Sequence, residues 1–129
     1  MARVVLDSSA LLAFINGEPG REIIASHLPD AVISAVNYAE VVSKLIAKGG
    51  SVLQVTALLD VIDVEVVAFD QSQAVLAGNL ILRTKGFGLS LGDRACLALA
   101  SRESASAMTT DRIWEKAADG TGIAVQVVR

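Results

Sequence analysis

Short apolar runs alternate with helix-length segments along the chain. Val4-Val5-Leu6 is a continuous run of β-branched and bulky residues, which is typical of a strand buried on both faces. Similar runs predict further strands at 31–33, 64–69, 107–109 and 123–128. Apolar positions at helical spacing, together with capping and breaking residues, predict helices at 10–15, 21–28, 35–48, 51–62, 71–84, 91–102 and 111–118. This alternation predicts an α/β fold with a central, mainly parallel five-stranded sheet and crossover helices.

Composition adds bounds to this picture. At 129 residues, 53% of them hydrophobic, the chain is expected to form a single domain spanning residues 1–129. Met1-Ala2-Arg3 leads directly into the first strand, so we expect no signal peptide, and no apolar run approaches the ~20 residues of a membrane span. Cys96 is the only cysteine, which excludes an internal disulfide and favours a cytoplasmic location.

Four acidic residues stand out by their positions. Asp7 and Asp111 each follow a predicted strand, where parallel α/β sheets bind their ligands. Asp93 lies in the first turn of an apolar helix, and Glu40 lies too deep in its helix to be a cap. Each also has a structural explanation: Asp7 and Asp111 as helix caps, Asp93 in a capping box with Ser90, and Glu40 paired with Lys44.

Convergence of these four carboxylates would need a compensating charge. Like charges raise each other's pKa, and burial disfavours the ionised form. Mg²⁺ or Mn²⁺ resolves this conflict, because these cations take oxygen ligands and bind substrate phosphates as well. Such a site activates water for displacement at phosphorus. The acids therefore indicate metal-dependent hydrolysis of a phosphodiester. The net charge of −3 is not typical of a nucleic-acid-binding domain, although acids gathered on a metal would leave the remaining surface less negative.

Four segments resemble the motifs of PIN-domain nucleases in order. They are Val5-Leu6-Asp7-Ser8-Ser9-Ala10-Leu11-Leu12-Ala13, Tyr38-Ala39-Glu40-Val41, Leu91-Gly92-Asp93-Arg94-Ala95-Cys96-Leu97-Ala98-Leu99-Ala100 and Thr109-Thr110-Asp111-Arg112-Ile113-Trp114. The resemblance covers essentially the whole chain and is strongest to the VapC-type toxins of toxin–antitoxin pairs. It implies a PIN-like fold, which is a three-layer α/β/α sandwich, and an Mg²⁺- or Mn²⁺-dependent endoribonuclease that inhibits translation or growth. It also implies a homodimer and a cognate antitoxin.

The resemblance also implies roles for particular residues. Asp7, Glu40, Asp93 and Asp111 would be the acidic quartet that holds the metal and carries the catalysis, with Ser8 and Thr109 as supporting hydroxyls. The role of Glu115, one turn after Asp111, stays open. We expect the predicted helices 21–28 and 35–48 to form the walls of a groove for the antitoxin peptide.

Contacts to an RNA backbone would come from basic side chains near the acids. The candidates are Lys44, Arg94 and Arg112, with Arg83 and Lys85 further along the chain. Each of these side chains is equally explained as a solvated charge on a helix face. Trp114 stands at helical spacing from Ala117, which favours a core position over stacking on a base.

Two other classes of protein compete with a nuclease. A phospho-receiver domain has a similar length and alternation, and Asp70 does follow the third predicted strand. However, Asp7 lacks the acidic neighbour that such a domain needs, and no lysine follows a fifth strand. A catalytically silent α/β protein-binding module is the other alternative. Loss of one of the acids would favour it, and all four are present.

Overall fold

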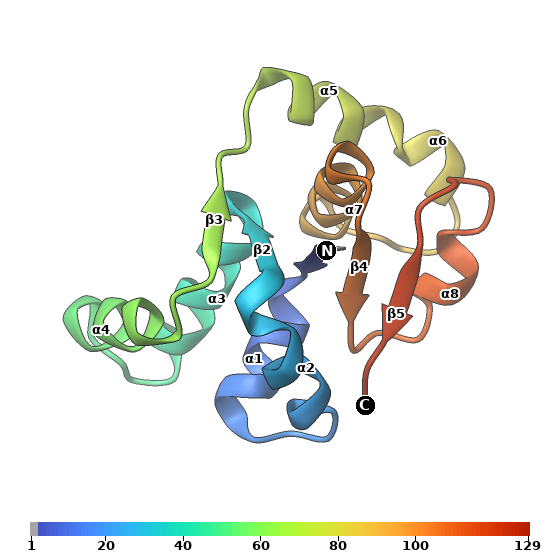
Figure 1. Ribbon diagram of the computed structural model, residues 1–129. Coiled ribbons are helices and arrows are strands. Elements are labelled where there is room, and N and C mark those ends of the chain that lie inside the picture. Colours follow the sequence, from blue (N-terminus) through green and yellow to red (C-terminus); the bar gives the residue numbers. More distant parts are fainter. Residues whose placement is uncertain (1–2) are drawn as a thin grey trace.

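Five parallel strands form the centre of the molecule (Figure 1). The computed structural model describes residues 3–129, so the predicted start at Met1-Ala2 lies outside the described residues. The strands are β1 (Val4–Leu6), β2 (Ala31–Ser34), β3 (Glu65–Val67), β4 (Ser106–Thr109) and β5 (Val125–Val127), in the spatial order β3-β2-β1-β4-β5. The predicted five-stranded parallel sheet is therefore confirmed.

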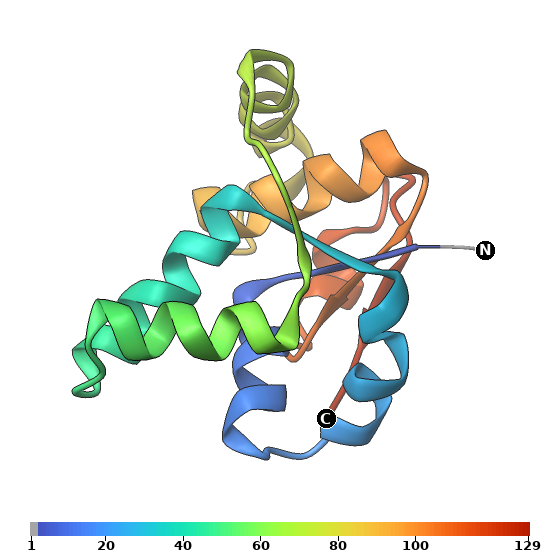
Figure 2. The ribbon, with the colours of Figure 1, turned by 60° about the vertical axis from the view of Figure 1, so that its left-hand side comes forward.

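Helices cover both faces of this sheet (Figures 1 and 2). They are α1 (Ser8–Asn16), α2 (Arg21–His27), α3 (Ala35–Ala47), α4 (Val52–Ile62), α5 (Gln71–Asn79), α6 (Ile81–Thr84), α7 (Leu91–Glu103) and α8 (Trp114–Ala117), with a short 3₁₀ turn, η1 (Leu28–Asp30), after α2. Val4 and Leu6 pack with α1 to α4 on one face, and Val5 packs with α5, α7 and α8 on the other. This arrangement confirms the three-layer sandwich and explains why β1 is apolar at every position.

Local capping signals set most helix starts. Ser34 accepts a hydrogen bond from the backbone N–H of Val36 and begins α3. Asp70 and Ser90 cap α5 and α7 through the N–H groups of the third helical residue. These caps satisfy backbone donors that have no partner within the helix. The predicted helix starts after Ser34, Asp70 and Ser90 are therefore confirmed.

The predicted bounds of four elements are wrong. The single helix at 71–84 is divided into α5 and α6 at Leu80, directly after Gly78 and Asn79, which have low helix propensity. The helix expected from Asp111 begins only at Trp114. Strands β3 and β5 are shorter than expected, because each lies at an edge of the sheet and is paired on one side only.

The strand order reverses beside β1, and we call the adjacent carboxyl ends of β1 and β4 at this reversal the β1–β4 crevice. The chain moves from β1 to β2 and β3 in one direction and later adds β4 and β5 on the other side of β1. The carboxyl ends of β1 and β4 are adjacent at this reversal, where open α/β sheets bind ligands. None of the helices within residues 3–129 is both long and apolar enough to cross a membrane.

Candidate functional site

Asp7 is the most deeply buried of the four acids. It follows β1, caps α1 and is only 4% exposed. Its Oδ1 accepts hydrogen bonds from the Ala10 N–H at 2.8 Å and from the Ser9 hydroxyl at 2.7 Å, and its Oδ2 accepts one from the Thr109 hydroxyl at 2.6 Å. Since Thr109 ends β4, these bonds join the two strands at the crevice. The cap and the candidate ligand are therefore the same carboxylate.

Burial changes the acidity of this carboxyl group. The pKa of Asp7 is raised from 3.8 to about 6, chiefly by loss of solvent, while the hydrogen bonds from Thr109, Ala10 and Ser9 lower it. The negative charge of Asp93 raises the pKa further. A buried carboxylate beside a second carboxylate favours a proton or a cation.

Asp93 is held by the predicted capping box on α7. Its Oδ2 accepts the Ser90 N–H at 2.8 Å, and its own N–H donates to the Ser90 hydroxyl at 3.1 Å. Burial raises the pKa of Asp93, the two bonds with Ser90 lower it, and the charges of Glu40 and Asp111 raise it. Asp93 thus lies within electrostatic reach of the other three acids, which places the predicted quartet around one crevice.

Glu40 projects from α3 towards the start of α7. Its Oε1 accepts a hydrogen bond from Asn37 Nδ2 at 2.9 Å, and the same nitrogen donates to the Gly92 carbonyl at 3.0 Å. The ion pair with Lys44 does not form. The described residues contain three ion pairs, Arg3–Glu65, Arg3–Glu103 and Arg102–Asp70, and none involves the quartet. No basic side chain in the described chain therefore neutralises these acids directly.

Asp111 lies in the loop after β4 and is exposed. Its N–H donates to the Thr109 hydroxyl at 3.1 Å, and its Oδ1 accepts the Ile113 N–H at 3.1 Å. It therefore closes a turn before α8 rather than capping a helix that starts at residue 112. Thr109 connects the exposed Asp111 to the buried Asp7 through one hydroxyl group.

One supporting hydroxyl differs from the prediction. Among the described residues, Ser9 rather than Ser8 bonds to Asp7, and its oxygen also accepts the Thr110 N–H at 3.1 Å. Ser8 is the first residue of α1 and makes no side-chain hydrogen bond within residues 3–129. The spacing Asp-x-Ser, in which a hydroxyl two residues on returns to the carboxylate, is the sequence signal that would have identified Ser9.

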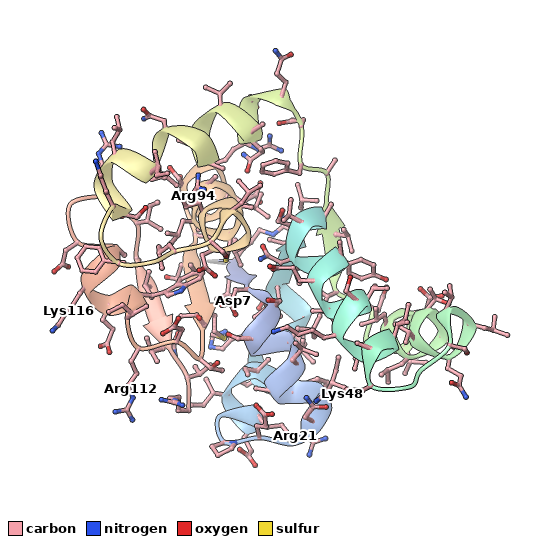
Figure 3. All side chains as sticks on the ribbon, turned by 180° about the vertical axis from the view of Figure 1, so that it is seen from behind. Asp7, Arg21, Lys48, Arg94, Arg112 and Lys116 are labelled. Carbon is pink, nitrogen blue, oxygen red and sulfur yellow. The ribbon has the colours of Figure 1, made fainter. Side chains whose placement is uncertain are left out.

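The basic candidates fall into two groups. Lys44 and Arg112 are exposed, and Figure 3 shows Arg112 at the periphery of the molecule. Arg94 instead packs beside α5, where its guanidinium donates to the Ala77 carbonyl at 2.9 Å. The structure thus gives Arg94 a role in joining α7 to α5 and does not direct it to the acids. Trp114 is fully buried, which confirms the core position. Glu115 is exposed on α8.

The chemistry of the donor set suits a divalent cation. All candidate ligands are carboxylate oxygens, which suit Mg²⁺ or Mn²⁺, and the raised pKa of Asp7 shows a carboxylate without a balancing charge. Within residues 3–129, no three acidic, histidine or cysteine side chains lie close enough to hold one ion together. Mg²⁺ is ordinarily held by one or two carboxylates, with waters and substrate phosphates completing its shell. The residues therefore fit a cation bound by one or two of these carboxylates.

Solved structures show the same fold. A toxin–antitoxin complex from Klebsiella pneumoniae contains a chain that is 19% identical, with 96% of both chains covered and a TM-score of 0.74. DNA-bound VapBC from Salmonella typhimurium is also 19% identical, with 98% of both chains covered and a TM-score of 0.73. VapC20 of Mycobacterium tuberculosis, described as a sarcin–ricin loop cleaving toxin, is 19% identical, with 88% of this chain and 94% of that chain covered and a TM-score of 0.74.

Sequence comparison identifies the family. None of the curated proteins compared with this chain matches it. The sequence profile of the PIN domain matches residues 4–120, which includes all four acids and every strand except β5. This match spans most of the chain and agrees with the order of the four motifs. The chain belongs to the PIN domain family.

Proposed function

We propose that this protein is a metal-dependent endoribonuclease and the toxin of a toxin–antitoxin pair. The observation that carries the proposal is the group of four carboxylates at the β1–β4 crevice, in which no basic side chain of the described chain pairs with an acid. Membership of the PIN domain family supports it. VapC20, a structural neighbour, is described as cleaving the sarcin–ricin loop, which supports RNA as the substrate class.

Each acid has a distinct part in this mechanism. Asp7 and Asp93 would hold Mg²⁺ or Mn²⁺, with Glu40 and Asp111 at the rim. A cation held by these residues would supply an activated water and stabilise the leaving oxygen. Thr109 and Ser9 orient the carboxylate of Asp7, and Ser90 orients that of Asp93. Because Asn37 occupies Oε1 of Glu40, Oε2 is the oxygen that remains available to a ligand or a proton.

RNA would approach the acids from the solvent side of the crevice. Exposed Asp111 marks this open side, and exposed Lys44 and Arg112 are the basic residues that we assign to the RNA backbone. Such contacts supply affinity without selecting a sequence. Arg94 is left out of this set, because its guanidinium is engaged with Ala77.

An antitoxin and a second copy of the chain are the proposed protein partners. Structural neighbours include VapBC and FitAB assemblies. Helix α1 contacts both α2 and α3, the proposed walls of the antitoxin groove, and α4 exposes Val52, Leu53 and Val61. Apolar side chains gathered on one helix are typical of a protein interface. Co-expression with the neighbouring upstream gene checks this proposal, and purification of the chain without a small partner would count against it.

The function is tested by cleavage of a mixed RNA pool with Mg²⁺ or Mn²⁺. Wild type should cleave, EDTA should stop cleavage, and Asp7→Asn should slow it more than about 100-fold, since even residues that only orient metal ligands contribute roughly 10- to 100-fold. Asp70→Asn is the matched control, because Asp70 is also a helix cap but lies on α5. Cleavage that survives both EDTA and Asp7→Asn would contradict the proposal. Metal titration by calorimetry on wild type and Asp93→Asn separates a nuclease selective for one RNA from a binding module.

A further inference from the structure

A buried amide joins two of the helices that carry the acids. Asn37 is 1% exposed, and its Nδ2 donates to Glu40 on α3 and to the Gly92 carbonyl on α7. We propose that Asn37 is a positioning residue, which fixes the Glu40 carboxylate against the first turn of α7 and so sets its place relative to Asp93. This inference rests on the proposed nuclease function and adds a residue that acts through Glu40.

The chemistry of an asparagine amide fits this position. One amide nitrogen carries two N–H donors, and here each finds an acceptor, at 2.9 Å on Glu40 and 3.0 Å on Gly92. The reverse orientation would direct the amide oxygen at two acceptors, so these neighbours determine which way the amide faces. The oxygen, Oδ1, is buried without a hydrogen-bond partner in the described part of the chain. The amide is therefore held through its nitrogen alone.

Gly92 makes room for the carboxylate that Asn37 holds. A methyl group at this position would lie 2.7 Å from Glu40 Oε1 and closer still to Oε2. Real side chains do not approach so closely, so Glu40 could not keep its place beside any residue larger than glycine. We call the three residues Asn37, Glu40 and Gly92 the clasp.

The clasp opposes electrostatic repulsion. Glu40 and Asp93 are both negative, and the charge of Glu40 raises the pKa of Asp93. Without a constraint, a flexible glutamate on α3 would turn towards solvent and away from Asp93. A hydrogen bond from a neutral donor to a carboxylate is stronger than one between neutral groups, and it keeps the two acids together. Asn37 therefore allows two like charges to share one crevice.

Kinetics on Asn37→Ala test this role. In single-turnover cleavage of RNA, the rate constant should fall roughly 10- to 100-fold while half-saturation by RNA changes little, as for other residues that orient metal ligands. In a Glu40→Ala background, Asn37→Ala should cause no further loss, because its effect passes through Glu40. An equal loss in both backgrounds would overturn the proposal. Asn79→Ala, an exposed asparagine in α5, is the matched control.

Gly92→Ala should reproduce the defect by displacing Glu40. Its control is Gly78→Ala, since Gly78 is also helical and an added methyl group there meets nothing within 4 Å. Circular dichroism on all variants establishes that each is folded. Wild-type cleavage by Gly92→Ala would contradict the clasp.

A readout that needs no activity separates the two proposals. In NMR spectra, the two side-chain N–H signals of Asn37 should exchange slowly with water in wild type, and exchange should accelerate in Glu40→Ala and in Gly92→Ala. Unchanged exchange in Glu40→Ala would overturn the clasp. Wild type that cleaves no RNA would overturn the nuclease function, whereas equal cleavage by wild type and Asn37→Ala would overturn the role of Asn37 alone.

Discussion

Asp7 and Asp70 occupy nearly identical local structures with opposite electrostatic outcomes. Each caps a helix that follows a strand, accepts the N–H of the residue three positions on, and accepts the hydroxyl of a serine two positions on. Yet the pKa of Asp7 is raised to about 6, chiefly by burial, and that of Asp70 is lowered by the Gln73 N–H and by Arg102. The same kind of cap therefore favours the ionised carboxylate at Asp70 and disfavours it at Asp7.

The difference arises from the sheet and not from the cap. Asp70 follows β3 at the edge of the sheet, where it is exposed and 3.0 Å from the Arg102 guanidinium. Asp7 follows β1 at the centre, where β4 brings Thr109 against it and α7 brings Asp93 near. Local sequence determines the hydrogen bonds of a cap, and its place in the sheet determines whether the charge is tolerated.

The largest effect separating the two residues should appear in stability against pH. Because the pKa of Asp7 is raised from 3.8 to about 6, the folded chain holds its proton more tightly than the unfolded chain. The protonated carboxyl therefore stabilises the fold at pH values below 3.8, and this stabilisation, about 3 kcal/mol, is lost as pH rises through 6. Without metal, the free energy of unfolding of wild type should therefore fall between about pH 4 and about pH 7. Asp7→Asn should flatten this decline, because Asn does not titrate. Its amide oxygen still accepts the Ala10 N–H, so the helix cap is kept.

Asp70→Asn is the contrasting variant. The lowered pKa of Asp70 means that its stabilising contribution is present above the unfolded pKa and lost as pH falls, so Asp70→Asn should lower stability at neutral pH and leave stability at the acid end unchanged. Urea titrations across this pH range measure both effects. Added Mn²⁺ should stabilise wild type at neutral pH and leave Asp7→Asn unchanged. A parallel decline in wild type and Asp7→Asn would show that Asp7 does not cause it.

Thr109→Val should have an intermediate effect. It removes the donor to Asp7 Oδ2 and the acceptor of the Asp111 N–H at nearly constant volume. The loss is expected to be about 2 kcal/mol of stability at neutral pH, typical of a buried hydrogen bond to a charged group. The pKa of Asp7 should rise further, because the Thr109 bond is the largest influence that lowers it.

Urea denaturation and NMR titration of Asp7 measure these two changes. Thr109→Ser should restore both, since it keeps the hydroxyl. Thr56→Val is the control, because the Thr56 hydroxyl bonds only to carbonyls of its own helix, α4. If the pKa of Asp7 were the same in Thr109→Val and wild type, the contact between the strand ends would not govern this carboxylate.

Arg102→Ala should have the smallest effect. Its ion pair with Asp70 is exposed, and exposed pairs of this kind are screened by solvent and salt. We expect little change in the urea midpoint at low salt and none at high salt, with cleavage of RNA unaltered. A marked loss of stability in Arg102→Ala would place Asp70 in the same class as Asp7 and remove the contrast between them.

The sequence predicts features of the fold that are local. Ser34 and Ser90 predict the starts of α3 and α7, and the apolar run at Val4 to Leu6 predicts a strand with two buried faces. The interruption at Leu80 follows Gly78 and Asn79, which have low helix propensity, and the late start of α8 at Trp114 follows the turn at Asp111, so apolar spacing alone did not reveal either. The ends of β3 and β5 depend on which neighbour each strand has.

The candidate site, like the fold, could be predicted from the sequence only in part. The sequence singles out four acids by their positions and by motif order, and the structure brings them within electrostatic reach, while their functional role stays a prediction. Their supports were recognised less well. Ser9, not Ser8, contacts Asp7, and Asn37 holds Glu40 where Lys44 was expected. Each correction concerns which way a side chain turns. The two contacts are local, but Ser9 also accepts the Thr110 N–H and Asn37 also donates to the Gly92 carbonyl, and both of these partners come from distant segments. The burial of Arg94 against Ala77 is a further example.

The hydrogen bond between Thr109 and Asp7 spans 102 positions of the chain. The segment with Asp7 leaves the ribosome well before the segment with β4, so Asp7 cannot make this hydrogen bond until β4 has been synthesised. Nascent chains that stop before residue 106 carry three of the four acids and lack the strand that holds Asp7. An enzyme that cut RNA while still attached to its own message would end its own production. Pairing of β1 with β4 therefore delays completion of the site until β4 has been synthesised.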